Sequence, residues 1–217
     1  MIKYAVFDLD GTLLDTITTI TYYVNLALSS ENIEKISEDE CKYFVGNGAR
    51  LLIRRALESR GAYDEEAYGR VWEIYNREYN RNTLYLTAPY DGIPELISAL
   101  KERGITLAVL SNKPDFATRD IIPSFFGEAF ATVHGARDNI ALKPMPDGVY
   151  EICRELGATP DQIMYLGDSG VDMQTGKNSG AALTVGVSWG FRTKAELFEN
   201  GADVVVDSPI EILDLIK

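Results

Sequence analysis

Histidine and cysteine are scarce in this chain of 217 residues, which has one histidine and two cysteines. His134 has no cysteine or second histidine as a partner, so a zinc-type metal site is disfavoured and a structural role is expected. Cys41 and Cys153 fall on predicted helices far apart in the sequence. Without a secretion signal, both thiols are expected to stay reduced and to serve as packing residues.

Long hydrophobic runs are missing as well. No stretch approaches the ~20 apolar residues of a membrane-spanning helix, and the opening MIKYAVFDLDG becomes acidic too early for a signal peptide. Because 46% of the residues are apolar, the composition is that of a globular protein. We therefore expect a cytoplasmic monomer or homodimer with no membrane partner.

Basic residues are outnumbered, 21 against 33 acidic ones, which gives a formal net charge of −12. This balance argues against nucleic-acid binding, which depends on lysine and arginine neutralising phosphates. An acidic protein that binds an anionic substrate needs a local cation, either a metal ion or converging basic side chains.

The apolar residues occur in short runs that are nearly continuous rather than alternating, as is typical of strands buried on both faces of a parallel sheet. The predicted strands are Tyr4–Phe7, Ile105–Leu110, Ala131–Val133, Ile163–Leu166, Leu183–Val187 and Val204–Val206. Segments with helical spacing lie between them, including Ile93–Glu102 and Val149–Leu156, which Gly157 is expected to end. This alternation predicts an α/β protein with a doubly wound parallel sheet.

Residues 16–84 interrupt the alternation, because they contain no convincing strand. Amphipathic helices are predicted at Ile17–Ser29, Ser37–Tyr43, Ala49–Arg60 and Asp64–Arg81. Ser37 and Glu40 have the spacing of a capping box. We predict a helical domain at residues 16–84, inserted into a core made of residues 1–15 and 85–217.

Polar residues follow the predicted strands, where parallel sheets bind ligands. These residues are Asp8, Asp10, Ser111, Asn112, Lys143, Asp168 and Asp172. Because the carboxyl ends of parallel strands share one edge, we expect the groups to meet there. Crowded carboxylates raise one another's pKa unless a cation is present. Asp8, Asp10 and Asp168 form a cluster of hard oxygen ligands that suits Mg²⁺.

Phosphoryl transfer is the chemistry that such a set could perform. Asp8 could attack phosphorus as a nucleophile, and Asp10 could offer its backbone carbonyl to the metal while its side chain works as acid and base. Ser111 and backbone N–H groups near Gly11 and Asn112 could hold phosphate oxygens. Lys143 would supply positive charge.

Four motifs in this order resemble those of the haloacid dehalogenase superfamily of phosphotransferases. They read DLDGT (8–12), LSN (110–112), KP (143–144) and GDSGVD (167–172). The resemblance implies a Rossmann-like core with an inserted helical cap. It implies the following roles: Asp8 as nucleophile, Asp10 as acid and base, Ser111 and Lys143 as phosphate ligands, Asp168 as metal ligand, and Asp172 supporting the metal site or orienting Lys143. Dehalogenases of the superfamily lack the second aspartate, so Asp10 favours phosphate chemistry.

Finer detail resembles phosphoglycolate phosphatases, a branch of this superfamily. The similar segments are FVGNGARLLIRRAL (44–57), SNKP (111–114), KPMPDGVY (143–150) and GVSWGF (186–191). Met145 stands where that branch usually has histidine, and Gly176, Lys177 and Asn178 replace alanines. The expected activity is Mg²⁺-dependent hydrolysis of a small anionic phosphorylated metabolite, with 2-phosphoglycolate as the leading substrate.

Other functions stay open at this point. A pyrophosphatase or a sugar-phosphate phosphatase would use the same core motifs. A mutase related to β-phosphoglucomutase is less favoured, because residues 16–84 contain no histidine. A binding protein that has kept the fold is disfavoured by the intact motifs.

Three further residues are candidates for contact with substrate. Arg50 lies in the first turn of the helix predicted from Ala49, where it could meet an anionic group such as a substrate carboxylate. A solvated basic face is the alternative for this arginine. Thr12 could face the phosphate or stabilise the turn after Asp10. Lys113 could reach the phosphate or the leaving group.

Overall fold

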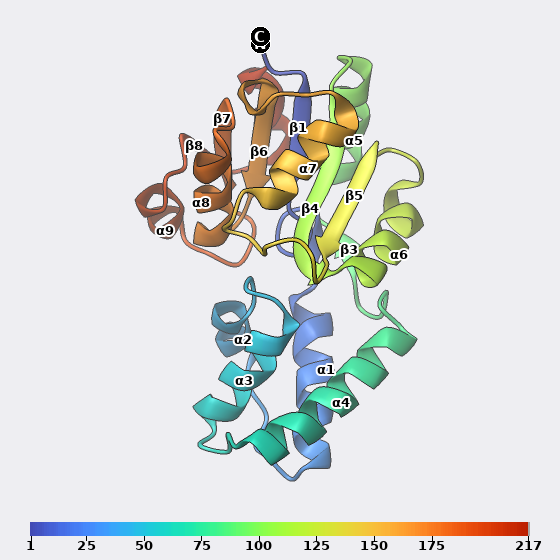
Figure 1. The fold of residues 1–217 in the computed structure, drawn as a ribbon, viewed down its shortest axis with the longest axis vertical. Helices are drawn as coiled ribbons and strands as arrows, with labels where there is room; N and C mark the ends of the chain where they lie inside the picture. Colours follow the sequence, from blue (N-terminus) through green and yellow to red (C-terminus); the bar gives the residue numbers. More distant parts are fainter. Residues whose placement is uncertain (217) are drawn as a thin grey trace.

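A six-stranded parallel sheet forms the centre of the computed structural model, which describes residues 1–216 (Figure 1). The strands are β1 (Tyr4–Phe7), β4 (Thr106–Pro114), β5 (Thr132–Ala136), β6 (Ile163–Gly167), β7 (Leu183–Val187) and β8 (Val204–Val206). Their order is β5-β4-β1-β6-β7-β8. The chain extends the sheet on one side of β1 and then on the other, as in doubly wound folds. The predicted α/β fold class is confirmed.

The register of the three central strands places the polar motifs level with one another. Phe7 is paired with Val109 on β4 and with Leu166 on β6. The residues that follow these three positions therefore emerge at the same edge of the sheet. A hydrogen bond from the Asp8 N–H to the Leu166 carbonyl, 2.9 Å long, continues the pairing up to that edge.

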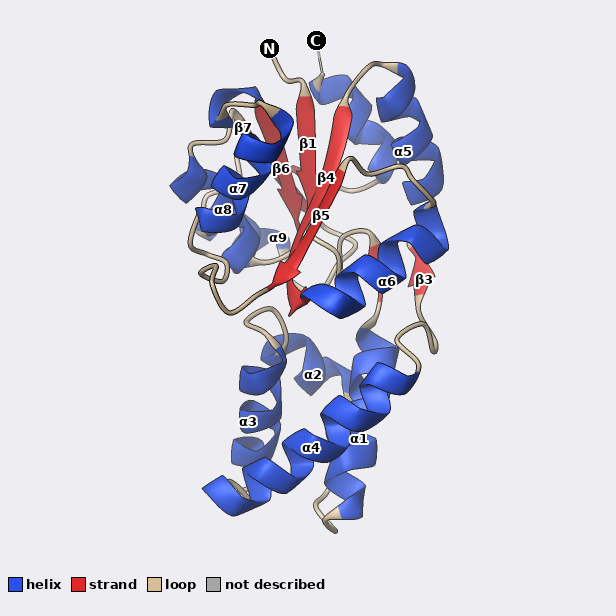
Figure 2. Ribbon diagram, turned by 45° about the vertical axis from the view of Figure 1, so that its right-hand side comes forward, coloured by secondary structure: helices blue, strands red, loops and turns tan. Residues whose placement is uncertain are grey.

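Helices cover both faces of the sheet, with α5 and α6 on one face and α7 and α8 on the other (Figure 2). Their bounds are α5 (Ile93–Glu102), α6 (Asp115–Phe126), α7 (Asp147–Leu156), α8 (Gly170–Ser179) and, beyond β7, α9 (Lys194–Glu199). Phe7 packs into the larger apolar cluster and Val6 into a second one with Val149 and Ile152 of α7. Both faces of β1 are thus buried, which explains its continuous apolar sequence. Gly157 ends α7 with a φ of 63°, as expected from the sequence.

Four helices lie together beyond the carboxyl edge of the sheet (Figure 1). They are α1 (Ile17–Ser30), α2 (Glu38–Phe44), α3 (Ala49–Ser59) and α4 (Glu65–Arg81). Ser37 and Glu40 form the expected capping box, and Asp64 caps α4 through the N–H of Ala67. We call these helices the cap, and the division of the chain at residues 16–84 stays a prediction. Within residues 1–216, no helix is both long and apolar enough to cross a bilayer.

A short antiparallel ribbon joins the cap to the core at the two points where the chain passes between them. β2 (Leu14–Asp15) pairs with β3 (Ala88–Pro89), with Leu14 opposite Pro89 and Asp15 opposite Ala88. The sequence did not predict this ribbon, because two residues are too few to produce a periodic pattern. It holds both connecting segments side by side below the sheet edge.

Candidate active site

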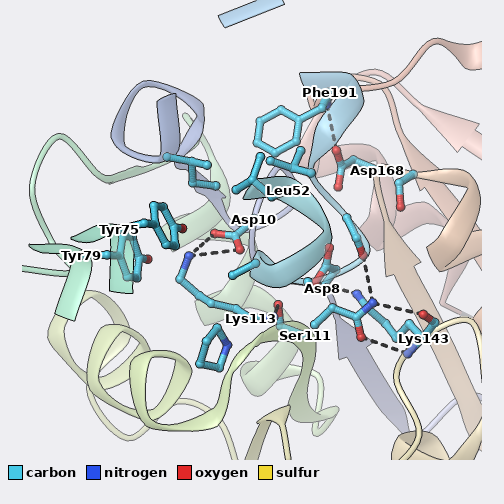
Figure 3. Close-up of a pocket in the computed structure, with 18 of the residues that line it drawn as sticks. Asp8, Asp10, Leu52, Tyr75, Tyr79, Ser111, Lys113, Lys143, Asp168 and Phe191 are labelled. Atoms are coloured by element: carbon cyan, nitrogen blue, oxygen red, sulfur yellow. Dashed lines mark hydrogen bonds and ion pairs between the residues drawn. The ribbon is translucent and has the colours of Figure 1, made fainter. Parts of the chain in front are cut away.

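A pocket lies between the carboxyl edge of the sheet and the cap, and side chains from both line it (Figure 3). The core contributes Asp8, Asp10, Ser111, Asn112, Lys113, Lys143 and Asp168, and the cap contributes Gly48, Ala49, Leu52, Tyr75 and Tyr79, among others. The structure therefore brings together the polar residues that follow β1, β4 and β6, as the sequence predicts. It adds an apolar and aromatic roof from α3 and α4.

Lys143 lies between two carboxylates, those of Asp8 and Asp172. We call these three residues, together with Asp168, the floor of the site. Its Nζ is 2.7 Å from Asp8 Oδ1 and 2.7 Å from Asp172 Oδ1. Burial opposes the ammonium charge, but the two carboxylates hold the pKa of Lys143 well above its ordinary value. This lysine therefore carries a fixed positive charge in an acidic protein.

Asp8 is buried, and its surroundings disfavour its ionised form. Burial and the nearby charge of Asp172 raise its pKa to about 7, although Lys143 acts in the opposite direction. Asp8 Oδ1 contacts Lys143 in an ion pair of 2.7 Å and has no further hydrogen-bond partner. A buried carboxylate with so few protein partners can bind a cation or a reacting phosphorus atom.

Asp168 is fixed by contacts on several sides. Its Oδ2 accepts a hydrogen bond from the backbone N–H of Phe191, 2.8 Å long, and its Oδ1 accepts one from the Thr12 hydroxyl, 3.2 Å long. A Cβ at Gly11 would lie 2.3 Å from Asp168 Oδ2, and one at Gly190 would lie 2.3 Å from Asp168 Cβ. Only glycine fits at these two positions. Burial and the charges of Asp172 and Asp8 raise the pKa of Asp168.

A divalent cation fits the carboxylates on this floor. Asp8, Asp168 and Asp172 offer oxygens within 4.8 Å of one another, and all three residues are buried. Hard oxygen donors at this density suit Mg²⁺ or a similar ion. The third carboxylate of this cluster is Asp172. The side chain of Asp10, which the sequence predicted for the cluster, points in another direction.

The Asp10 carboxylate turns away from Asp8 toward the cap (Figure 3). Lys113 Nζ donates to both of its oxygens, at 2.9 and 3.1 Å. The same ammonium group lies 5.1 Å from the centre of the Tyr79 ring of α4. Gly11, with a φ of 86°, turns the chain directly after Asp10, a backbone conformation that favours glycine.

Ser111 and Asn112 lie at the pocket, but the Asn112 side chain is fully engaged by the protein. Ser111 is buried, and its Oγ accepts a hydrogen bond from the Lys113 N–H. The Asn112 amide donates to the carbonyls of Gly46 and Lys143 and accepts from the Lys143 N–H. Its side chain thus ties the Lys143 loop to the cap, which leaves the Asn112 backbone as the candidate for a phosphate contact.

Arg50 and Thr12 are both engaged by other residues of the protein, and their contact with substrate stays a prediction. The exposed Arg50 guanidinium stacks 4.9 Å from the centre of the Trp72 ring and does not line the pocket. Thr12 is occupied with Asp168, and its carbonyl accepts a hydrogen bond from Trp189. The placement of Arg50 does not support its expected contact with an anionic group. The arginine that does line the pocket is Arg192.

Arg192 links the core to the cap at the rim of the pocket. It donates to the backbone carbonyls of Lys42 and Val45, and its guanidinium lies 5.6 Å from the centre of the Tyr43 ring. The sequence did not predict a role for this residue. The available signal was the position of Arg192 directly after the GVSWGF segment, two residues beyond Gly190. His134 lies away from the pocket and pairs with Glu155 at 2.9 Å, in keeping with the expected structural role.

Comparisons with known proteins agree with this fold and site. A family model described as haloacid dehalogenase-like hydrolase matches residues 5–185. A phosphoglycolate phosphatase of Haemophilus influenzae is 31% identical over 216 residues, which cover 97% of this chain and 96% of that protein. An N-acetylmuramic acid 6-phosphate phosphatase of Pseudomonas aeruginosa is 28% identical, covering 99% of this chain and 95% of that protein.

Solved structures show the same architecture. A protein from Lactobacillus delbrueckii subsp. bulgaricus superposes with a TM-score of 0.93 at 31% identity, covering 99% of this chain and 98% of that one. The family match spans most of the chain and includes all four motifs whose side chains meet at the pocket. The chain therefore belongs to the haloacid dehalogenase-like hydrolase family.

Proposed function

We propose that this protein is a Mg²⁺-dependent phosphomonoesterase that acts on a small anionic phosphate ester, with 2-phosphoglycolate as its substrate. The observation that carries the proposal is the pair Asp8 and Asp10. The Asp8 carboxylate is buried in an ion pair with Lys143, and the Asp10 carboxylate, two residues later, is turned toward the cap and pairs with Lys113. Hydrolysis through an aspartyl-phosphate needs one carboxylate in each of these two positions.

The reaction has two steps. In the substrate complex Asp10 has taken up a proton. In the first step an Asp8 oxygen bonds to phosphorus, the ester P–O bond breaks, and the leaving oxygen takes that proton from Asp10. In the second, Asp10 takes a proton from water, whose oxygen bonds to phosphorus as the bond to Asp8 breaks. Inorganic phosphate leaves, and Asp8 and Asp10 return to their starting states.

Charge on the transferred phosphoryl group is balanced by Lys143 and by donors at its edge. Lys143 lies within ion-pair distance of Asp8, the attacking group. Ser111 and backbone N–H groups between Asp8 and Gly11 and near Asn112 bind the phosphate oxygens, although the Gly11 N–H itself donates to the Leu14 carbonyl. Mg²⁺ bound by Asp8, Asp168 and the backbone carbonyl of Asp10 would add positive charge at the same oxygens. Asp172 orients Lys143, from which it is 2.7 Å away.

The relatives support the short substrate. The protein of Haemophilus influenzae that is 31% identical to this chain is named a phosphoglycolate phosphatase, whereas the N-acetylmuramic acid 6-phosphate phosphatase of Pseudomonas aeruginosa is 28% identical. Two relatives with different names also make the second ester a necessary member of any substrate panel.

The cellular setting is part of the proposal. Cys41 and Cys153 are both free and buried, which fits a reducing compartment such as the cytoplasm. The enzyme works there on a free metabolite, as a monomer or a homodimer.

Phosphate release from a panel of esters tests the substrate. The panel contains 2-phosphoglycolate, pyrophosphate, N-acetylmuramic acid 6-phosphate, β-glucose 1-phosphate and p-nitrophenyl phosphate, each with and without Mg²⁺. We expect kcat/KM for 2-phosphoglycolate to exceed the others by at least about 10²-fold. Equal rates across the panel would leave the core chemistry in place but refute the substrate. A Mg²⁺-independent rate would refute the metal.

Thermal unfolding tests the metal without measuring activity. Mg²⁺ should raise Tm more at pH 8 than at pH 5.5, because ligand carboxylates must be ionised to bind it. The pKa of Asp8 is raised to about 7, so protons compete with the metal below that pH. In the metal-free protein the stability depends on pH in the opposite direction. The protonated form of Asp8 stabilises the folded protein, and this contribution is lost as the pH rises through 7.

The Asp168→Asn variant is the control for this measurement. It keeps the shape of the side chain but removes one carboxylate ligand, so the pH-dependent rise in Tm should shrink. A Tm shift of the same size at both pH values, or one unaffected by this substitution, would place the metal elsewhere.

A further inference from the structure

Lys113 is a buried cation that the two-step reaction does not use. It follows Ser111 and Asn112 at the end of β4, and its side chain is 5% exposed. Its Nζ contacts both oxygens of Asp10, at 2.9 and 3.1 Å. A lysine whose ammonium group contacts both oxygens of one carboxylate fixes the position of that group.

The cap completes the environment of this lysine. Tyr79 belongs to α4, is 4% exposed and presents its ring to Lys113, with the Nζ 5.1 Å from the ring centre. Tyr75, one turn earlier, stacks on Tyr79 with ring centres 5.6 Å apart and planes inclined by 12°. A cation over an aromatic face is attracted to it, and more strongly when water is excluded. The ring is in place only while α4 covers the sheet edge.

We propose that Lys113 is the positioning residue of Asp10, and that Tyr79 makes this positioning depend on the cap. With the cap in place, the Tyr79 ring holds the ammonium group, and the ammonium group holds the Asp10 carboxylate away from Asp8. When the cap leaves, Lys113 loses its ring contact and Asp10 loses a fixed support. Asp10 is therefore aligned for proton transfer in the covered pocket, where water is excluded.

The dependence of the rate on the leaving group tests this role. An alkoxide leaving group needs the Asp10 proton, whereas p-nitrophenolate is stable as an anion. The Lys113→Met variant should lower kcat/KM by about 10²-fold or more for 2-phosphoglycolate, and by less than about tenfold for p-nitrophenyl phosphate. The ratio kcat/KM covers only the steps up to formation of the aspartyl-phosphate, so slow hydrolysis of that intermediate does not obscure the comparison.

Two substitutions of Tyr79 test the link to the cap. Tyr79→Leu removes the ring and should show the same leaving-group dependence as Lys113→Met. Tyr79→Phe keeps the ring face and should show a much smaller loss. Lys113→Arg keeps the positive charge and should recover part of the alkyl phosphate activity. Lys194→Met, at an exposed lysine that pairs with Asp207, is the matched control for the loss of a lysine charge.

Several outcomes would overturn the inference. An equal loss on both esters would show that Lys113 acts on the phosphate or on the fold. Wild-type rates on both esters in Tyr79→Leu and in Tyr79→Phe would remove the cap from the account. If Lys113→Met does not fold, the Tyr79 pair still decides. The inference rests on the proposed function for the role of Asp10, but any alkyl phosphate that the enzyme hydrolyses serves, so an incorrect substrate leaves this test intact.

Discussion

The Asp8→Asn variant is expected to lose hydrolysis by a factor on the order of 10⁵ while keeping its fold, because the amide cannot form the bond to phosphorus. Without metal, its Tm at pH 8 should equal or exceed that of the wild type. Burial and Asp172 raise the pKa of Asp8 to about 7, so the ionised side chain is a cost to the folded state above that pH. Lys143 keeps Asp172 as its partner in the variant.

The measurements for Asp8 are single-turnover phosphate release and a pair of thermal melts at pH 5.5 and pH 8. The Asp161→Asn variant is the control, because Asp161 is exposed just before β6, at the opposite end of the sheet from the pocket. It should match the wild type in both assays. Substantial hydrolysis by Asp8→Asn would rule out the aspartyl-phosphate route. A large fall in the Tm of Asp8→Asn at pH 8 would contradict the inference that ionised Asp8 destabilises the folded protein.

The strands could be predicted closely because the sheet is buried on both faces. Tyr4–Phe7, Leu183–Val187 and Val204–Val206 have the predicted bounds, because most positions in a strand buried on both faces are apolar. β4 instead continues from Leu110 to Pro114 through polar residues. Its pairing with β5 shifts register after Leu110 and resumes at Pro114, opposite Ala136, and such a backbone irregularity leaves no apolar signal in the sequence.

The convergence of the core residues also follows from the sequence, but the directions of their side chains do not. The order of strands and their register bring Asp8, Ser111 and Asp168 to one edge. The ion pair of Asp10 with Lys113 depends on side-chain directions, and the Tyr79 ring of the cap lies beside it. A sequence pattern assigns residues to elements and gives no docking angle between two domains.

Arg50 shows how the rotation of one helix decides a role. Ala49 and Leu52 of α3 line the pocket, and these positions are three residues apart, on one face of the helix. Arg50 follows Ala49 directly, so its side chain projects about 100° further around the helix axis. There it stacks on the Trp72 ring. The sequence correctly predicted the helix and its start. It could not show which face would be turned toward the sheet.

The Lys143→Met variant is expected to lose both activity and stability, because it leaves Asp8 and Asp172 buried without their common cation. Removing one partner of a buried ion pair costs about 3–5 kcal/mol. The variant also lacks the positive charge that Lys143 supplies beside Asp8. Hydrolysis should therefore fall by at least about 10³-fold. Urea unfolding and phosphate release are the measurements. Lys177→Met, which breaks an exposed pair with Asp203, is the matched control and should cost less than about 1 kcal/mol.

The stability loss in Lys143→Met should depend on pH in a definite direction. Lys143 lowers the pKa of Asp8, so its removal moves that pKa further above the value of about 7. The folded variant then gains a proton that the unfolded chain binds only near pH 4, and this proton relieves the repulsion with Asp172. The deficit should be largest at pH 8 and smaller at pH 5.5, and Mg²⁺ should recover part of it at pH 8. A deficit independent of pH would mean that Lys143 supports the fold by packing alone, and that the positive charge at this floor comes from elsewhere.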